Sequence, residues 1–174
     1  MSTILDSLGQ HYFQTAYVVK NIEESEKWFG STLGVPIWAR SEVVLDENCQ
    51  YRGQPADSAM LISLGFAGDV QIELIQPVRG QSIYTEFLDQ GRSGLHHIAF
   101  VVPEYDQVVA AFEQRNCELL QQGSLSDGQV RFSYFDCNND QASVIEILDF
   151  STETMAAMND LKQQCKQAVA AKNG

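Results

Sequence analysis

The sequence predicts an α+β fold in which two tandem βαβββ modules form a curved mixed sheet around a central cleft, followed by a C-terminal helix. The prediction has three sources: a repeated strand–helix segment, a repeated strand with a central glutamate, and a tail of strong helix formers. We expect one domain over residues 1–150, with modules at about 11–80 and 95–150, and a helical extension over residues 151–174.

The repeat is visible when the chain is aligned with itself. A shift of 83 positions places QTAYVVKNIEESEKWF (14–29) on HIAFVVPEYDQVVAAF (97–112), with Ala16 on Ala99 and Phe29 on Phe112. A shift of 73 positions places IELI (72–75) on IEIL (145–148). The shared order of these segments, more than the identity within any one of them, indicates two modules built to the same plan.

In the first module, alternating side chains predict the strands and a capping residue predicts the helix. FQTAYVV (13–19) is rich in β-branched and aromatic residues, as strands are. Asn21 is a suitable N-cap and Gly34 a suitable stop for the helix that follows. We then expect a strand within 36–44, a loop at 46–57, and a hairpin of SAMLISLG and VQIELI joined by FAGD.

The second module follows a short connecting helix, SIYTEFLDQG (82–91). We expect its helix at 104–116 and its strands at 96–102, 118–122, 130–136 and 143–150. The tail begins at a capping Ser151 or Thr152 and continues with good helix formers. We expect this last helix to pack on the outside of the domain or on a partner.

Charge and composition restrict the partners. The chain has 23 acidic and 11 basic residues and a net charge of -12, which disfavours nucleic acid and anionic membranes. It has no apolar run near the roughly 18 residues of a membrane span and no signal-peptide pattern, so we expect a cytoplasmic protein with a small-molecule substrate. The cysteines form no C-x-x-C pair, which predicts reduced, structural thiols at Cys49, Cys117, Cys137 and Cys165.

Four polar residues lie on strand faces whose other members are mainly small or apolar. Side chains alternate along a strand, so each of these residues shares a face with neighbours two positions away, as Gln14 does with Ala16. An isolated carboxylate on a face that lines a cavity is strongly disfavoured, and a divalent cation removes that penalty. This pattern predicts a metal site with two ligands from each module: Gln14, Glu73, His97 and Glu146.

The alternative is that these residues have no common role. A single glutamate in an amphipathic strand usually faces water, and a histidine at the start of a strand is usually structural. The same polar positions in a repeated frame favour the metal interpretation over this one.

The segments FLDQGRSGLHHIAFVV (87–102) and AYVVKNIEESEKWFGSTLGV (16–35) resemble the vicinal oxygen chelate superfamily. This superfamily includes glyoxalase I, methylmalonyl-CoA epimerase, extradiol dioxygenases and bleomycin-resistance proteins. The chain is most similar to the epimerases and to glyoxalase I-like proteins, over about residues 13–150. The resemblance implies metal ligands on the first, fourth, fifth and eighth strands, at Gln14, Glu73, His97 and Glu146. The epimerases usually carry histidine at the first position, whereas this combination is similar to that of some glyoxalase I enzymes.

The resemblance also implies an activity. It suggests a divalent-metal-dependent isomerase, epimerase or lyase, with one Ni, Co, Mn or Zn ion, that stabilises the enolate of a small α-oxygenated carbonyl or thioester substrate. The expected catalytic base is Glu146, with Glu73 as the next candidate. The epimerases use a glutamate base on the third strand, but SAMLISLG has no carboxylate. Arginines that could hold a glutathione carboxylate are Arg40, Arg79, Arg92 and Arg131.

Two further questions stay open at the level of the sequence. The alternative function is a metal-free protein that sequesters a ligand in the same cleft, as bleomycin-resistance proteins do. We expect a homodimer, and the sequence leaves open whether the modules close the cleft within one chain or across the dimer.

Overall fold

The computed structural model describes residues 4–137 and 144–173. The elements of the first half are a 3-10 helix η1 (Ile4–His11), β1 (Tyr12–Val18), α1 (Ile22–Thr32), β2 (Ala39–Leu45), β3 (Gln50–Tyr51), β4 (Gln54–Pro55), β5 (Ser58–Ala67) and β6 (Val70–Arg79). The helix α2 (Ile83–Asp89) leads into the second half, which comprises β7 (Gly94–Val101), α3 (Tyr105–Gln114), β8 (Glu118–Leu125), β9 (Val130–Asp136), β10 (Val144–Phe150) and α4 (Thr152–Asn173).

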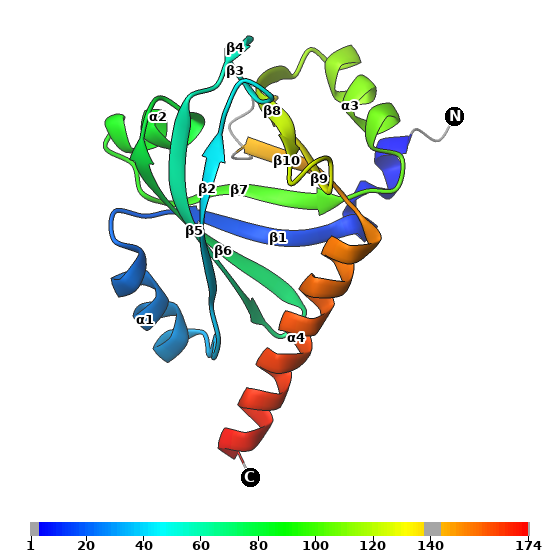
Figure 1. The fold of residues 1–174 in the computed structure, drawn as a ribbon. Coiled ribbons are helices and arrows are strands. Elements are labelled where there is room, and N and C mark those ends of the chain that lie inside the picture. The colour runs from blue at the N-terminus through cyan, green and yellow to red at the C-terminus, as the bar shows by residue number, and fades with distance from the viewer. Residues whose placement is uncertain (1–3, 138–143, 174) are drawn as a thin grey trace.

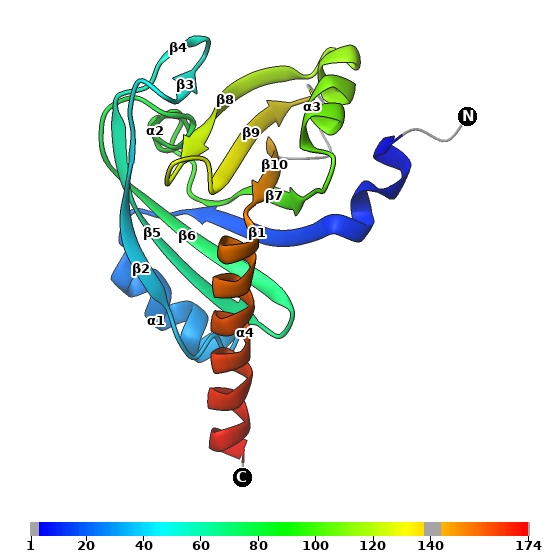
Figure 2. The same ribbon diagram turned by 45° about the vertical axis from the view of Figure 1, so that its right-hand side comes forward.

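The strands form one curled mixed sheet, with α1 and α3 outside it and α4 crossing its open side (Figures 1 and 2). Its order is β2-β5-β6-β1-β7-β10-β9-β8-β3-β4. The central strands β1 and β7 are antiparallel, while β6 runs parallel to β1 and β10 parallel to β7. Each half therefore contributes the same βαβββ pattern on either side of a pseudo-twofold axis, which confirms the predicted fold class.

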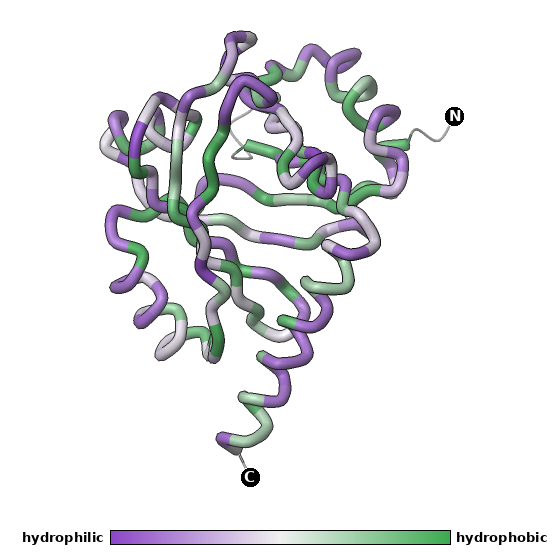
Figure 3. Tube along the Cα trace, in the orientation of Figure 1, coloured by the Kyte–Doolittle hydropathy of each residue, from purple (hydrophilic) through white to green (hydrophobic). Residues whose placement is uncertain are grey.

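The helices α1 and α3 cover the outer face of the sheet and leave its inner face free. From α1, Ile22 and Phe29 pack with Ile72 and Leu74 of β6. In the same way, Val108 and Phe112 of α3 pack with residues of β9 and β10. Hydrophilic residues are interspersed with hydrophobic ones along the central strands (Figure 3), and those on the inner face form the site described below.

Side-chain capping fixes the starts of α1, α2 and α4, whereas α3 has no side-chain cap hydrogen bond. As expected, the Asn21 side chain accepts hydrogen bonds from the first-turn amides of α1, and Ser151 accepts one from Thr154 N at the start of α4. Ser82 forms a capping box with Thr85 at α2. None of the helices in the described part of the chain is long and apolar enough to cross a membrane.

The segment 46–57 is not the loop that its polar composition predicts. It contains the short hairpin β3–β4, which pairs with β8 of the other half through Gln50↔Gln122 and Tyr51↔Gln121. Arg52 at the turn binds Glu86 and Glu118, so side chains distant in sequence hold the hairpin in place. The close approach also needs Gly123, because a Cβ there would lie 2.5 Å from the sulfur of Cys49.

The prediction that all four cysteines are reduced is wrong for two of them. Glu118 is the cross-strand partner of Asp136, and this register brings the adjacent Cys117 and Cys137 together as a disulfide. Their separation of 20 residues hid this pairing in the sequence. Cys49 and Cys165 are free and buried, as expected.

Candidate metal centre and its cavity

The register of the strands brings the four polar residues together on the inner face of the sheet, in two adjacent rows of cross-strand partners. In one row, Glu73 of β6 and His97 of β7 lie on either side of Ala16 of β1. In the next row, Ala99 of β7 has Gln14 of β1 and Glu146 of β10 as its neighbours. The two alanines are repeat-related and fully buried, so small side chains at the pseudo-twofold axis leave room between the four polar ones.

The structure brings three of the expected ligands into one cluster. His97 Nε2 lies 3.1 Å from Glu146 Oε2 and 3.4 Å from Glu73 Oε2. One ligand atom from each residue lies within 4.8 Å of the other two, and all three residues are buried. Nitrogen and oxygen donors at this separation are a suitable donor set for a divalent cation.

Several polar atoms of the site are buried without a hydrogen-bond partner of good geometry among the described residues. They are Glu73 Oε2, His97 Nε2 and Gln14 Oε1. A buried polar atom without a partner costs about 1–3 kcal/mol. For His97 Nε2 and Glu73 Oε2, their 3.4 Å ion pair reduces this cost when His97 is protonated. A bound cation would satisfy all of them at once, and the donor set therefore fits a metal ion.

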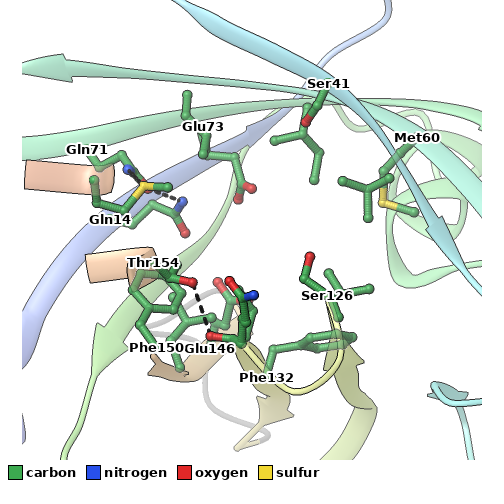
Figure 4. A pocket seen from close by; sticks show the side chains of 18 of the residues that line it. Gln14, Ser41, Met60, Gln71, Glu73, Ser126, Phe132, Glu146, Phe150 and Thr154 are labelled. Carbon is green, nitrogen blue, oxygen red and sulfur yellow. Dashed lines mark hydrogen bonds between the residues drawn. The ribbon is translucent and has the colours of Figure 1, made fainter. Parts of the chain in front are cut away.

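Gln14 is oriented by its neighbours. Its amide nitrogen donates a hydrogen bond to Gln71 Oε1 at 2.8 Å (Figure 4). Gln71 Nε2 in turn donates to Met158 Sδ of α4 at 3.1 Å. These bonds occupy the donor side of the Gln14 amide and leave its oxygen, the only ligand atom an amide offers, free.

The charges of the cluster are strongly perturbed. Burial opposes a charge on His97, but the adjacent Glu146 and Glu73 carboxylates outweigh it and raise the pKa of His97 to about 9. Burial raises the pKa of Glu73, an effect that His97 reduces. In the absence of a metal, the imidazolium is therefore the counter-ion of the carboxylates.

His96 contacts the His97 ring on the side away from the carboxylates. Its ring packs against Tyr84 and Phe87 of α2, and burial lowers the pKa of His96 to about 3. Its Nδ1 lies 3.0 Å from His97 Nδ1, so a neutral His96 can accept the His97 proton there and direct the opposite nitrogen, Nε2, to the carboxylates. The sequence alone does not predict this contact, because side chains alternate along a strand and adjacent histidines are expected on different faces.

A cavity of about 420 Å³ lies over the cluster (Figure 4). Sequence analysis missed three of its polar residues: Tyr84 on the connecting helix, Tyr134 on β9 and Gln121 on β8. The Tyr84 hydroxyl donates to that of Tyr134 at 2.8 Å, and burial raises the pKa of both well above its usual value. Tyr134 could have been found from strand register, because it is the cross-strand partner of Glu146.

The helix α4 lines the cavity, whereas the sequence predicts a helix on the outside of the domain or on a partner. Its residues at the cavity are Glu153, Thr154, Ala157 and Met158. The first turn is held to the β8–β9 turn because Ser151 N and Thr154 Oγ1 both donate to the Gln129 carbonyl. Further along the helix, Leu161 and Cys165 are buried with Phe66 of β5.

The arginines considered for a glutathione carboxylate lie outside the cavity lining. Arg40 pairs with Glu23 and Glu26 of α1, and Arg79 pairs with Asp57. The other two are likewise engaged elsewhere, Arg131 with Asp106 and Asp149, and Arg92 over the ring of Phe87.

Solved structures with the same fold include several methylmalonyl-CoA epimerases. The enzyme from Mycobacterium tuberculosis has a TM-score of 0.65 and 16% identity, over 90% of this chain and 97% of that one. A methylmalonyl-CoA epimerase in complex with methylmalonyl-CoA and NH4+ has a TM-score of 0.58 and 16% identity, over 82% and 95% of the two chains. A Streptomyces coelicolor epimerase variant in complex with 2-nitronate-propionyl-CoA gives the same values. At identities this low, the structural likeness establishes the fold and nothing further.

Sequence comparison gives the family. No curated protein has a significant match to the chain. The family model of the Glyoxalase/Bleomycin resistance protein/Dioxygenase superfamily, in contrast, matches residues 13–134, which include three of the four expected ligands and more than half of the chain. The chain therefore belongs to the glyoxalase/bleomycin resistance protein/dioxygenase superfamily.

Proposed function

We propose that the protein is a divalent-metal-dependent isomerase, epimerase or lyase that moves a proton at a carbon next to a carbonyl. The observation that carries this proposal is the convergence of unpartnered, buried ligand atoms from Gln14, Glu73 and His97 beside Glu146. A metal-free sequestering protein would bear the cost of these atoms without any use for them, so the enzyme is favoured over that alternative.

The residues have separable roles in this proposal. His97, held by His96, and Gln14, held by Gln71, are fixed ligands, and a bound divalent cation would supply Lewis-acid stabilisation of negative charge on a substrate oxygen. The carboxylate of Glu146 takes the proton from carbon, and Glu73 is the alternative base. The cavity-lining residues of β5, Met60, Ile62 and Leu64, are apolar, so this strand offers no base and the two glutamates of the cluster are the candidates.

Two measurements test the proposal. Elemental analysis of untagged protein purified without chelators should find about one divalent metal per chain. In D2O, the metal-loaded protein should introduce deuterium next to the carbonyl of at least one member of a panel of α-hydroxyketones, hemithioacetals and acyl-CoA esters, as followed by NMR. Absence of metal after loading with Ni, Co, Mn and Zn would reject the proposal.

The Gln14 position offers a gain-of-affinity test. Gln14→His should strengthen metal binding, on the order of tenfold, because an imidazole nitrogen is a better ligand than an amide oxygen for these metals. Competition with a chelator of known affinity measures the change, and Gln14→Leu, which offers no ligand atom, is the matched control. Weaker binding by the histidine variant than by the wild type would contradict the assigned geometry.

Truncation tests the contribution of α4. Deleting residues 152–174 should reduce the free energy of unfolding by about 3 kcal/mol, because Leu161 and Cys165 lose their buried positions against β5. Metal affinity should also fall, since Gln71 loses its Met158 partner. Deleting only residues 167–174, which lie beyond the cavity lining, is the control. Thermal unfolding and chelator competition should separate the two truncations, and equal behaviour would exclude a role for the first turns of α4.

A further inference from the structure

The cavity over the cluster has no basic residue in its lining. All eleven lysines and arginines of the chain lie in the described residues, and none of them lines the cavity. The ionised groups that do line it are Glu73, Glu146 and, at the exposed first turn of α4, Glu153. An anionic group of a ligand would lose its hydration in this cavity without gaining a counter-charge from a side chain.

The rest of the wall is mainly apolar. Strands β2 and β5 contribute Val43, Met60 and Ile62, and the opposite side contributes Leu125, Phe132 and Leu148. Met60 and Phe132 lie across the cavity from one another in Figure 4. Such a surface favours a hydrocarbon or aromatic portion of a ligand, by roughly 25 cal/mol for each Å² of apolar area removed from water.

Gln121 is the exception in this wall. It is the cross-strand partner of Tyr134, and thus continues the row that contains Glu146 out to β8. Its side chain is 1% exposed and lines the cavity. It lies close enough to Tyr84 to affect the pKa of that hydroxyl, yet neither its amide nitrogen nor its oxygen has a hydrogen-bond partner of good geometry. The amide can donate to and accept from a neutral polar group, and it carries no charge to hold an ionised one.

We propose that the substrate is an uncharged, largely apolar molecule whose neighbouring oxygens face the Glu73–His97–Glu146 cluster and whose distal neutral polar group binds the Gln121 amide. The inference rests on the function proposed above and narrows its substrate class. Polyanionic thioesters of coenzyme A and charged glutathione adducts are disfavoured, since no lysine or arginine lines the cavity to pair with their anionic groups and the chain has a net charge of -12.

The test uses hydroxamates, which present two neighbouring oxygens to a metal. Metal-loaded protein of known metal content is titrated by calorimetry with three probes of equal chain length: hexanohydroxamic acid, the monohydroxamate of adipic acid and the monohydroxamate of adipamide. They end in a methyl group, a carboxylate and a carboxamide, respectively. The first and third should bind at least about tenfold tighter than the second, because only the carboxylate must be desolvated as an ion.

Variants assign the selectivity to the cavity. Gln121→Met should weaken the carboxamide probe several-fold and leave the methyl-ended probe unchanged, with thermal unfolding confirming that the variant is folded. Glu153→Gln, an exposed substitution, should retain most of the discrimination against the carboxylate. Loss of discrimination in this variant would mean that one charge at the cavity mouth, not the cavity, selects the ligand.

The outcomes separate this inference from the proposed function. If the carboxylate-ended probe binds as tightly as the others, the substrate class is wrong while metal chelation stands. If no probe binds protein that contains its metal, the chelating site is wrong and the substrate class is rejected with it.

Discussion

His97→Ala should lose nearly all of its bound divalent metal. His97 is fully buried and supplies the nitrogen donor of the three-residue cluster, with its Nε2 between the two carboxylates. Mutating a residue that merely orients a ligand typically costs about 10–100-fold in metal affinity, so removing the imidazole itself should cost at least as much. Elemental analysis after gel filtration, at equal protein concentration, measures the effect.

The chain provides its own controls for this experiment. His11 lies in η1, outside the cluster, so His11→Ala should retain the metal and shows whether surface histidines bind it. His96→Ala should have an intermediate effect, because it removes the neighbour of His97 Nδ1 without removing a ligand. His97→Ala leaves two buried carboxylates without a counter-ion and also leaves a cavity, so it can lose metal by unfolding. His97→Gln is therefore a second variant, which keeps the side-chain volume filled. Unchanged metal content in folded His97→Gln and His97→Ala would reject the site.

Glu146→Gln should abolish proton transfer while the protein remains folded. An amide has the shape of the carboxylate but cannot take a proton from carbon, and a positioned base typically contributes about 10²–10⁴-fold to the rate. Deuterium incorporation from D2O into the substrate found by the screen measures the transfer itself, whichever overall reaction it belongs to. Thermal unfolding checks that the buried substitution is tolerated.

Glu73→Gln is the matched comparison, because it removes a carboxylate from the same cluster. Both variants lose one ligand oxygen, so each rate must be compared at equal metal occupancy, reached by adding metal. If Glu146 is the base, Glu73→Gln should keep most of the exchange rate when loaded and Glu146→Gln should not. The reverse result would transfer the role to Glu73, and full activity in both would remove the glutamates from proton transfer.

The core of the site could be predicted because strand periodicity is a strong and local signal. Alternation along β1, β6, β7 and β10 places the expected ligand of each strand on the inner face, and the repeat shows that these strands are equivalent. The parallel pairing of β1 with β6 and of β7 with β10 then brings Glu73 and His97 to either side of Ala16, and Gln14 and Glu146 to either side of Ala99.

The wall of the cavity could not be predicted, because it depends on contacts between segments distant in sequence. Tyr84 reaches the site from a connecting helix, whose position is set by tertiary packing and not by local pattern. The tail has a helical composition that indicates its conformation but not its neighbour, which proves to be β5. Gln121 is inconspicuous in ELLQQGSL, and its importance comes from the lack of a hydrogen-bond partner of good geometry among the residues that the structure describes.

The β3–β4 hairpin has a consequence for the order in which the chain can fold. It belongs to the first half in sequence but completes the edge of the second half, where Gln50 pairs with Gln122. During synthesis this hairpin has no strand to join until β8 has left the ribosome, and such non-local pairing slows folding. The first half therefore cannot reach its final structure before β8 of the second half is available.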